Sequence, residues 1–411
     1  MKHAGIVPLI GGEILASDDA YGKIPEYLMT YSGFTGNEEH LVKYYKDKGH
    51  NVPYHILDEN PGIKLENVDV VSSVCPCAGL STYHNSHGEQ NENNQWMEKS
   101  SEYVLKQVRP KVLWGENAPG LAGKIGAFMR EKLYHLGQEN GYNFSIFLTK
   151  SLLHGNPQYR KRTFFFFWQK EHFGDQVPVL NFIKKERPTI QELILSVKTN
   201  FQTEILNKKT PSKDDPYYRF MLEEVMGGMT HAEYSKSVAH EPKSVTIESR
   251  LMKMGYRHSL IAEWMDGFGE EFEREAAKAR RKDAKIASGG NIMLRGTIIP
   301  VSYIGAFVVH LPKVVAHPVE DRYLNIAEAK AIMGLPDDLE VIDPLKNYNH
   351  ICQNVPFHTA RDMAVEVQAC LNNKRDKIET KYLFQNNLAQ KYDYTRDENN
   401  LEAFLWWKKY Y

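Results

Sequence analysis

The chain has 411 residues, with 51 lysines and arginines against 52 aspartates and glutamates and a formal net charge of −1. Its 42% hydrophobic and 25% charged residues are typical of a folded globular protein and exclude collagen-like, coiled-coil and disordered chains. The balanced charge excludes a global polycation, so any binding of nucleic acid must depend on a local basic surface.

The four cysteines are too few and too scattered for a disulfide framework or a four-ligand zinc site. They are Cys75, Cys77, Cys352 and Cys370. The first residues lack the apolar run of a signal peptide, and no stretch of about 18 apolar residues could span a bilayer. We therefore expect a cytoplasmic protein in a reducing compartment, without a metal ion and without membrane contact.

Residues 1–172 alternate short apolar runs with helical patterns, which predicts βαβ units around a mostly parallel sheet. One apolar run stops at Cys75-Pro76-Cys77, so we expect Cys77 just beyond the carboxyl end of a strand, where open α/β sheets bind ligands. The expected strands are Gly5–Ile10, Gly33–Asn37, His55–Leu57, Val68–Val74, Val112–Trp114, Phe144–Leu148 and Thr163–Trp168, and the expected helices are Glu39–Lys48, Gln95–Val108 and Gly120–Asn140.

The texture changes over residues 173–295, where charge density rises and helical patterns dominate. We expect this segment to form a smaller inserted lobe. Apolar strand and helix patterns return over residues 296–375, which we expect to complete the first domain. Residues 376–411 are charged and then aromatic, and we expect them to form a tail.

A densely charged segment, Glu270–Lys285, is expected to be a helix with basic residues near its end, as suits a helix C-terminus. Two interpretations stay open for it: a solvated helix face, or a face that contacts the phosphates of a nucleic acid. The candidate phosphate contacts are Lys278, Arg280, Arg281 and Lys282.

Three short motifs carry groups suited to catalysis. Cys77 could act as a covalent nucleophile, because part of a cysteine population is thiolate near neutral pH. Glu116 follows the strand Val112–Trp114 and could act as a general acid. Arg160 and Arg162 alternate into the next strand, so both would point to one face and could bind an anion or a base carbonyl. Taken alone, each motif also fits a structural role.

In their order and spacing these motifs resemble the C5-cytosine DNA methyltransferase family over residues 5–371. Pro76-Cys77 with Ser81 resembles the nucleophile motif, and Glu116-Asn117-Ala118 resembles the Glu-Asn-Val motif. Residues 157–162 match the Pro-Gln-x-Arg-x-Arg motif in full. Later family motifs are matched by Arg322, Leu324, Asn325 and Glu328, by Gly334-Leu335-Pro336-Asp337, and by Cys352-Gln353-Asn354-Val355-Pro356.

The resemblance implies a Rossmann-like, S-adenosylmethionine-dependent methyltransferase domain with an inserted target-recognition lobe. It implies that a cytosine of double-stranded DNA is rotated into the site. Cys77 would then attack C6, Glu116 would protonate or bind N3, and Arg162 with Arg160 would hold O2 and flanking groups. Ser81 would contact the DNA. We expect a monomer in a bacterial or virus-infected bacterial cell, with a restriction-modification or viral self-protection role.

The cofactor end departs from the family pattern. Its opening motif has become Ile10-Gly11-Gly12-Glu13, with the first glycine lost, although two glycines still let the backbone approach a ligand. Glu38 resembles the acid that holds the ribose hydroxyls, and Asp58 the aspartate that contacts adenine. Gln353, Asn354 and Val355 resemble the last cofactor-binding motif. Ala78, Ala118 and Gln353 also differ from the family's usual residues.

These departures leave alternatives open. The donor could be a modified S-adenosylmethionine that carries a group larger than methyl. The chain could instead be a catalytically inactive DNA-binding homologue, which the altered glycine motif favours and the intact Cys77, Glu116, Arg160 and Arg162 oppose. A third alternative, methylation of RNA, is disfavoured by the length of the inserted lobe.

Overall fold

The protein was analysed as a computed structural model, which describes residues 1–34, 39–76, 78–80, 91, 93–198, 201–294, 296–308 and 310–388. The chain divides into two compact units. The catalytic unit comprises Met1–Arg187, Met333–Ile342 and the chain from His350 onward, and the second unit comprises Pro188–Ile332 and Asp343–Asn349. The second unit therefore begins later than the expected lobe of residues 173–295 and extends further along the chain.

An eight-stranded sheet forms the centre of the catalytic unit, with strand order β12-β6-β8-β5-β4-β1-β2-β3. All neighbouring strands are parallel except β8, which is antiparallel to both β5 and β6. The predicted α/β fold with a mostly parallel sheet is thus confirmed. The strands are β1 (His3–Ile6), β2 (Leu28–Thr30), β3 (Tyr54–Ile56), β4 (Val70–Val74), β5 (Val112–Asn117), β6 (Tyr142–Lys150), β8 (Lys161–Gln169) and β12 (Tyr382–Asn386).

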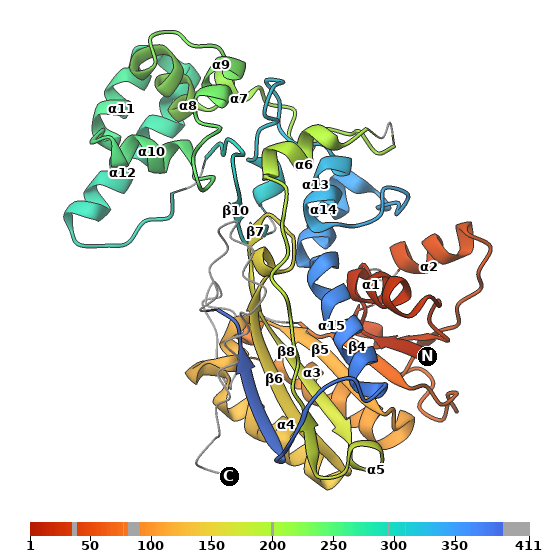
Figure 1. The fold of residues 1–411 in the computed structure, drawn as a ribbon. Coiled ribbons are helices and arrows are strands. Elements are labelled where there is room, and N and C mark those ends of the chain that lie inside the picture. Colours follow the sequence, from red (N-terminus) through yellow and green to blue (C-terminus); the bar gives the residue numbers. More distant parts are fainter. Residues whose placement is uncertain are drawn as a thin grey trace. The chain divides into compact units, whose positions relative to one another are not determined.

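Helices cover both faces of this sheet (Figure 1). Helices α3 (Asn94–Tyr103) and α4 (Ala127–Glu139) pack on one face, and α1 (Gly12–Tyr21) and α15 (Phe357–Leu371) on the other. The aromatic run in β8 explains why both faces need cover. Phe165 and Phe167 enter one core while Phe164, Phe166 and Trp168 enter the other, as the two-residue period of a strand requires. Burial of each such side chain contributes roughly 2–3 kcal/mol.

Two expectations about this sheet were wrong. The strand predicted at Gly33–Asn37 begins in a 3-10 turn, Ser32–Phe34, and its remaining residues lie outside the described part of the chain. The strand that pairs with β1 is the buried run Leu28–Thr30. The expected tail contributes β12, which pairs in parallel with β6, and β11 (Lys377–Glu379), which pairs with β9 (Gln176–Pro178). A short alternating segment such as Tyr382–Asn386 is hard to recognise between charged neighbours.

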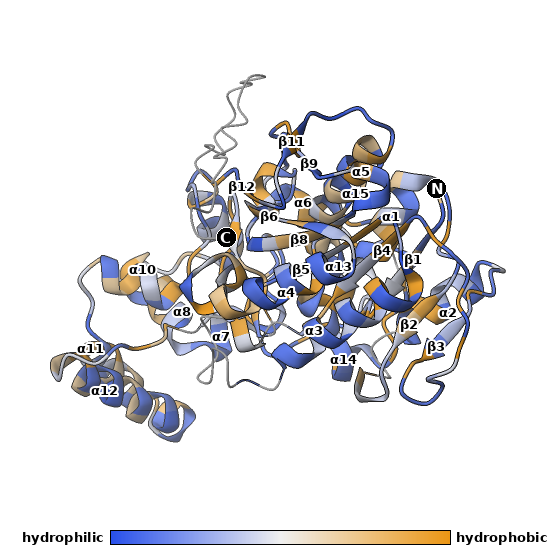
Figure 2. Cartoon of the chain, turned by 90° about the horizontal axis from the view of Figure 1, so that it is seen from below, coloured by the Kyte–Doolittle hydropathy of each residue, from blue (hydrophilic) through white to orange (hydrophobic). Residues whose placement is uncertain are grey.

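Helices dominate the second unit, and one hydrophobic core lies among α8 (Pro216–Phe220), α10 (Ile247–Lys253), α11 (His258–Asp266) and α12 (Glu273–Ala287). Ala276 and Ala279 of α12 face this core, whereas the remainder of that helix is largely hydrophilic (Figure 2). The helices with most of their residues in this unit are α6 (Ile190–Ser196), α7 (Pro211–Asp214), α8 (Pro216–Phe220), α9 (His231–Ser237), α10 (Ile247–Lys253), α11 (His258–Asp266), α12 (Glu273–Ala287), α13 (Ile326–Met333) and α14 (Pro344–Gln353); α2 (Glu39–Asp47) and α5 (Lys170–Phe173) belong to the catalytic unit.

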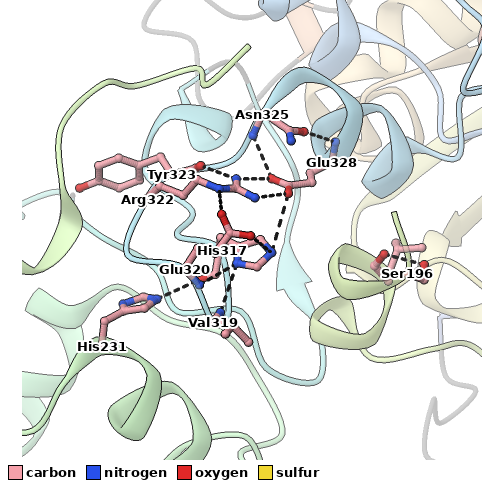
Figure 3. Close-up of polar contacts among 10 residues, drawn as sticks. Ser196, His231, His317, Val319, Glu320, Arg322, Tyr323, Asn325 and Glu328 are labelled. Carbon is pink, nitrogen blue, oxygen red and sulfur yellow. Dashed lines mark hydrogen bonds and ion pairs between the residues drawn. The ribbon is translucent and has the colours of Figure 1, made fainter. Parts of the chain in front are cut away.

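The motif around Arg322 and Glu328 forms a structural network in the second unit (Figure 3). Arg322 donates through Nη1 to Glu328 Oε2 (3.0 Å) and through Nη2 to Glu328 Oε1 (2.7 Å). Asn325 caps α13, because its side chain accepts from Glu328 N (2.8 Å) while its own N–H donates to the Glu328 carboxylate (2.9 Å). His317 Nδ1 accepts from the backbone of Val319 and Glu320, which orders the loop before Arg322.

This network predicts a large stability loss from a small change. Glu328→Gln should lower the free energy of unfolding by about 2–4 kcal/mol, because it leaves the half-buried Arg322 without its buried counter-charge. Urea denaturation measures this. The matched control is Glu320→Gln, whose carboxylate contacts the same arginine while 61% exposed and should cost under about 1 kcal/mol. Equal losses for the two variants would contradict the assignment.

Candidate active site and cofactor cradle

A buried carboxylate and an arginine meet at the carboxyl end of β5. Glu116 lies on β5 and Arg162 on the adjacent antiparallel β8, and Arg162 Nε forms an ion pair with Glu116 Oε1. The side chains are only 5% and 13% exposed. Burial raises the pKa of Glu116, and the positive charges of Arg162 and Arg160 oppose this rise without cancelling it. The site therefore presents a carboxyl that can carry a proton closer to neutral pH than an ordinary glutamate.

Arg160 has a different environment from Arg162. Its guanidinium is buried and donates to two backbone carbonyls, those of Cys352 (3.1 Å) and Asn354 (3.0 Å). Two directed, charge-assisted hydrogen bonds to the main chain fix this side chain in place. The two arginines of one motif thus have separate tasks: Arg162 pairs with the carboxylate, and Arg160 joins β8 to the segment before α15.

The predicted nucleophile Cys77 and the predicted DNA contact Ser81 lie outside the described residues. The preceding residues are described. Asn117 Nδ2 donates to the carbonyl of Cys75 (3.4 Å), which fixes the end of the strand next to Glu116. Cys75 itself is buried, with Sγ 3.1 Å from Ser73 Oγ, and burial raises its pKa to about 11. Cys75 is therefore an inert packing residue.

The loop between β1 and α1 has an unusual backbone. Val7 and Leu9 have φ angles of 50° and 51°, and Gly11 has 89°. Positive φ is costly for a β-branched valine, and such strain concentrates at binding sites. The loop ends against Asn354, whose Oδ1 accepts from Gly12 N (3.0 Å). A Cβ on Gly12 would lie 2.0 Å from Asn354 Nδ2, so only glycine fits.

The other predicted cofactor residues are placed as follows. Asp58 follows β3 and accepts from the backbone N–H of Ser32 (2.8 Å) and from its hydroxyl; burial acts to raise the pKa of Asp58, but these bonds outweigh it and lower the pKa. Glu13 is fully buried in the first turn of α1. Ile10 and Val355 are buried, Gln353 is exposed, and Glu38 lies outside the described residues.

These features fit a cofactor at the carboxyl end of β1. The glycine backbone cannot tolerate a side chain, and Asp58, whose pKa is lowered, follows β3, the second strand from β1 in the sheet. The buried Asn354 Nδ2 meets no hydrogen-bond acceptor among the described residues, so it can donate to a ligand. The sequence analysis did not identify Ser32 as the partner of Asp58, because it placed the second strand at the wrong segment.

Within the part of the chain that the structure describes, no group of three or more His, Cys, Asp or Glu side chains is arranged to hold a metal ion. The helices described there also include none of the length and apolarity needed to cross a membrane.

The sheet, the glycine cradle and the buried acid–arginine pair together define an α/β transferase with a Rossmann-like cofactor domain. The family model of the C-5 cytosine-specific DNA methylases matches residues 29–369, and the chain belongs to this family. The family implies S-adenosylmethionine as methyl donor and DNA as substrate.

Two similar proteins illustrate the membership. The Type II methyltransferase M.AgeI of Thalassovita gelatinovora is 22% identical over 380 residues, covering 77% of this chain and 86% of that protein. A crystal structure from an E. coli prophage, of a protein assigned as a DNA modification methyltransferase, superposes with a TM-score of 0.53 at 13% identity. It covers 90% of this chain and 99% of that one, and at this identity it shows the fold alone.

The cradle predicts that Gly12→Ala weakens cofactor binding at least tenfold, because the added Cβ must displace Asn354. Isothermal titration with S-adenosylhomocysteine measures the affinity. The control is Gly62→Ala, since a Cβ there meets no atom within 4 Å. Unchanged affinity of Gly12→Ala would place the cofactor elsewhere.

Proposed function

We propose that this protein methylates C5 of a flipped-out cytosine in double-stranded DNA through a covalent bond between Cys77 and C6. The carrying observation is the buried Glu116, paired with Arg162 and linked through Asn117 to the strand end that precedes Cys77. We assign it to bacterial DNA modification or to self-protection of a virus in a bacterial host.

In the proposed reaction, the Cys77 thiolate adds to C6 while Glu116 donates a proton to N3. This addition places an electron pair on C5, which becomes a carbon nucleophile. C5 then takes the methyl group, and S-adenosylhomocysteine is the leaving group. Loss of the C5 proton, return of the N3 proton to Glu116 and expulsion of the thiolate restore the aromatic ring. Arg162 holds Glu116 in position and supplies positive charge beside the base O2.

When bound, S-adenosylmethionine supplies an electrophilic methyl group. We assign its binding to the backbone of Gly11 and Gly12, to Asp58 and to Asn354. Of these, the Asn354 amide and the Gly12 N–H are already joined by a hydrogen bond, which fixes the cradle before the ligand arrives.

Mass spectrometry of nucleosides from DNA of cells expressing the chain tests the proposal, with Cys77→Ala as control. We expect 5-methylcytosine with the wild-type chain and none with the variant. Trapping on DNA that contains 5-fluorocytosine should give a covalent complex that the variant lacks. Methylation that survives in Cys77→Ala would refute the covalent mechanism, and absence of any product and adduct would favour an inactive DNA-binding homologue.

The role of Glu116 predicts a specific pH dependence. Its proton is lost as the pH rises through its raised pKa, so the wild-type rate should fall on the alkaline side. Glu116→Gln should lower kcat by roughly 10²–10⁴-fold and lose this alkaline limb. Single-turnover methyl transfer at a series of pH values measures both. Glu131→Gln, an equal charge change at an exposed position of α4, should behave as wild type.

A second candidate is a modified donor that carries a group larger than methyl. It is supported by the fully buried carboxylate of Glu13 in the first turn of α1. A cytosine product heavier than 5-methylcytosine in the same mass spectra would favour this candidate, and 5-methylcytosine alone would refute it.

We also propose that one face of α12 contacts DNA phosphates. Lys282 pairs with the fully buried Glu248, so this candidate stabilises the second unit. Arg280 forms a surface ion pair with Asp266, in which both side chains are about half exposed. The outward residues recur at intervals of three and four, opposite the buried Ala276 and Ala279. They form a basic stripe of four exposed residues: Arg274, Lys278, Arg281 and Lys285.

This stripe predicts the salt dependence of DNA binding. Arg281→Gln with Lys285→Gln should reduce the slope of log K against log salt concentration by about 0.9 for each lost phosphate contact. Fluorescence anisotropy on cognate and random DNA measures it, and both should weaken alike. Lys236→Gln with Lys243→Gln is the charge-matched control outside α12. Weaker binding of the cognate sequence alone would show that Arg281 and Lys285 contact bases rather than phosphates.

A further inference from the structure

A buried chain of hydrogen bonds crosses the base of the turn that carries the two arginines. His154 Nε2 lies 2.7 Å from Thr149 Oγ1, and His154 Nδ1 lies 2.8 Å from Asp362 Oδ2. The other oxygen of Asp362 contacts Lys185 Nζ. Thr149 and His154 are fully buried, and Asp362 is 6% exposed. None of these residues belongs to the motifs that define the family resemblance.

The contacts orient both nitrogens of the histidine ring. A carboxylate can only accept, so Nδ1 donates to Asp362, and Nε2 shares a second hydrogen bond with the Thr149 hydroxyl. Burial acts to raise the pKa of Asp362, but the hydrogen bonds and charges of His154 and Lys185 outweigh it and lower the pKa. The network is therefore directional and anchored on an ionised carboxylate.

Its first end lies beside the arginine of the active site. Thr149 of β6 is the register partner of Arg162 of β8. The turn between these strands is closed by Ser151, whose N–H and hydroxyl both donate to the carbonyl of Arg160 (3.0 and 3.3 Å). His154 occupies the middle of this turn. The position of His154 is thus coupled to the start of β8, where Arg160 and Arg162 lie.

Its second end lies on the segment that forms the cofactor cradle. Asp362 belongs to α15, which follows directly after Cys352 and Asn354, the residues whose carbonyls accept from Arg160. Asn354 in turn binds Gly12 N. One stretch of chain therefore holds the arginine turn at two points and the cradle at a third. These contacts connect the arginine turn, the start of α15 and the loop before α1.

We propose that His154 and Asp362 are positioning residues that set Arg162, and through it Glu116, relative to the bound donor. This inference rests on the proposed function, since it concerns the rate of that methyl transfer. Misplacing a reacting group by about 1 Å can cost roughly 100-fold in rate, so the effect belongs in kcat rather than in stability alone.

Two substitutions of His154 each keep one of its two side-chain contacts and remove the other. His154→Asn keeps a donor near the position of Nδ1 for Asp362, and His154→Gln keeps a polar atom near Nε2 for Thr149. Asp362→Asn removes the charge at constant size. We expect His154→Gln and Asp362→Asn to lower single-turnover kcat by about 10–100-fold while KM for DNA and for the donor stay within about threefold. His154→Asn keeps the contact with Asp362 and loses only the contact with Thr149, so its loss of rate should be smaller than that of His154→Gln.

A milder pair covers the case in which these variants fail to fold. Thr149→Val removes one hydroxyl at constant shape, and Thr149→Ser retains it. We expect a lower kcat for Thr149→Val, recovery in Thr149→Ser, and similar circular dichroism for both. Wild-type kcat in Thr149→Val together with a lowered melting temperature would overturn the proposal, because the network would then only stabilise the fold.

The wild-type chain separates this test from that of the proposed function. If it neither methylates cytosine nor forms an adduct with 5-fluorocytosine DNA, the proposed function fails whatever the variants do. If it does both and His154→Gln, Asp362→Asn and Thr149→Val all keep wild-type kcat, only the positioning role is wrong.

Discussion

The buried guanidinium of Arg160 joins two parts of the chain that lie almost two hundred residues apart, because it donates to the carbonyls of Cys352 and Asn354. The rest of the site depends on this contact. Asn354 reaches Gly12 only when its backbone is held there, and Gly12 begins the helix that follows the strained β1 loop. An arginine is suited to this task, since its planar fork can satisfy two carbonyls and cannot lose its charge.

The carboxyl end of β5 also contains a carboxylate, that of Glu116, which burial destabilises in its charged form. Glu116 is tolerated there because Arg162 compensates its charge, and yet the net effect is still a raised pKa. A carboxylate whose negative charge was fully compensated would stay ionised and be a poor proton donor. A buried carboxylate without any compensating charge would cost too much stability. The pair therefore combines a chemical task with a folding constraint, and β8, the strand of Arg162, also carries five buried aromatic side chains.

The sequence motifs predicted the fold class and brought Glu116, Arg160, Arg162, Gly12 and Asn354 into one family pattern. They could not predict how these residues divide the work, because Arg160 and Arg162 look alike two positions apart. The difference comes from tertiary partners at Cys352 and Asn354. The strand next to β1 was predicted at the wrong segment for a similar reason. Both candidate segments are short, and only pairing with β1 identifies Leu28–Thr30 as the strand.

The charge pattern of α12 also shows what the sequence alone cannot predict. Composition revealed a basic helix but not which ammonium and guanidinium groups have partners within the protein. Lys282 is the clearest case, since it compensates Glu248, a fully buried carboxylate that also contacts the fully buried His258. A charge whose loss would leave a buried carboxylate unpaired is retained for folding, whatever it resembles on the sequence. Exposed residues opposite the buried face compensate no buried carboxylate, so they can exchange solvent counterions for DNA phosphates.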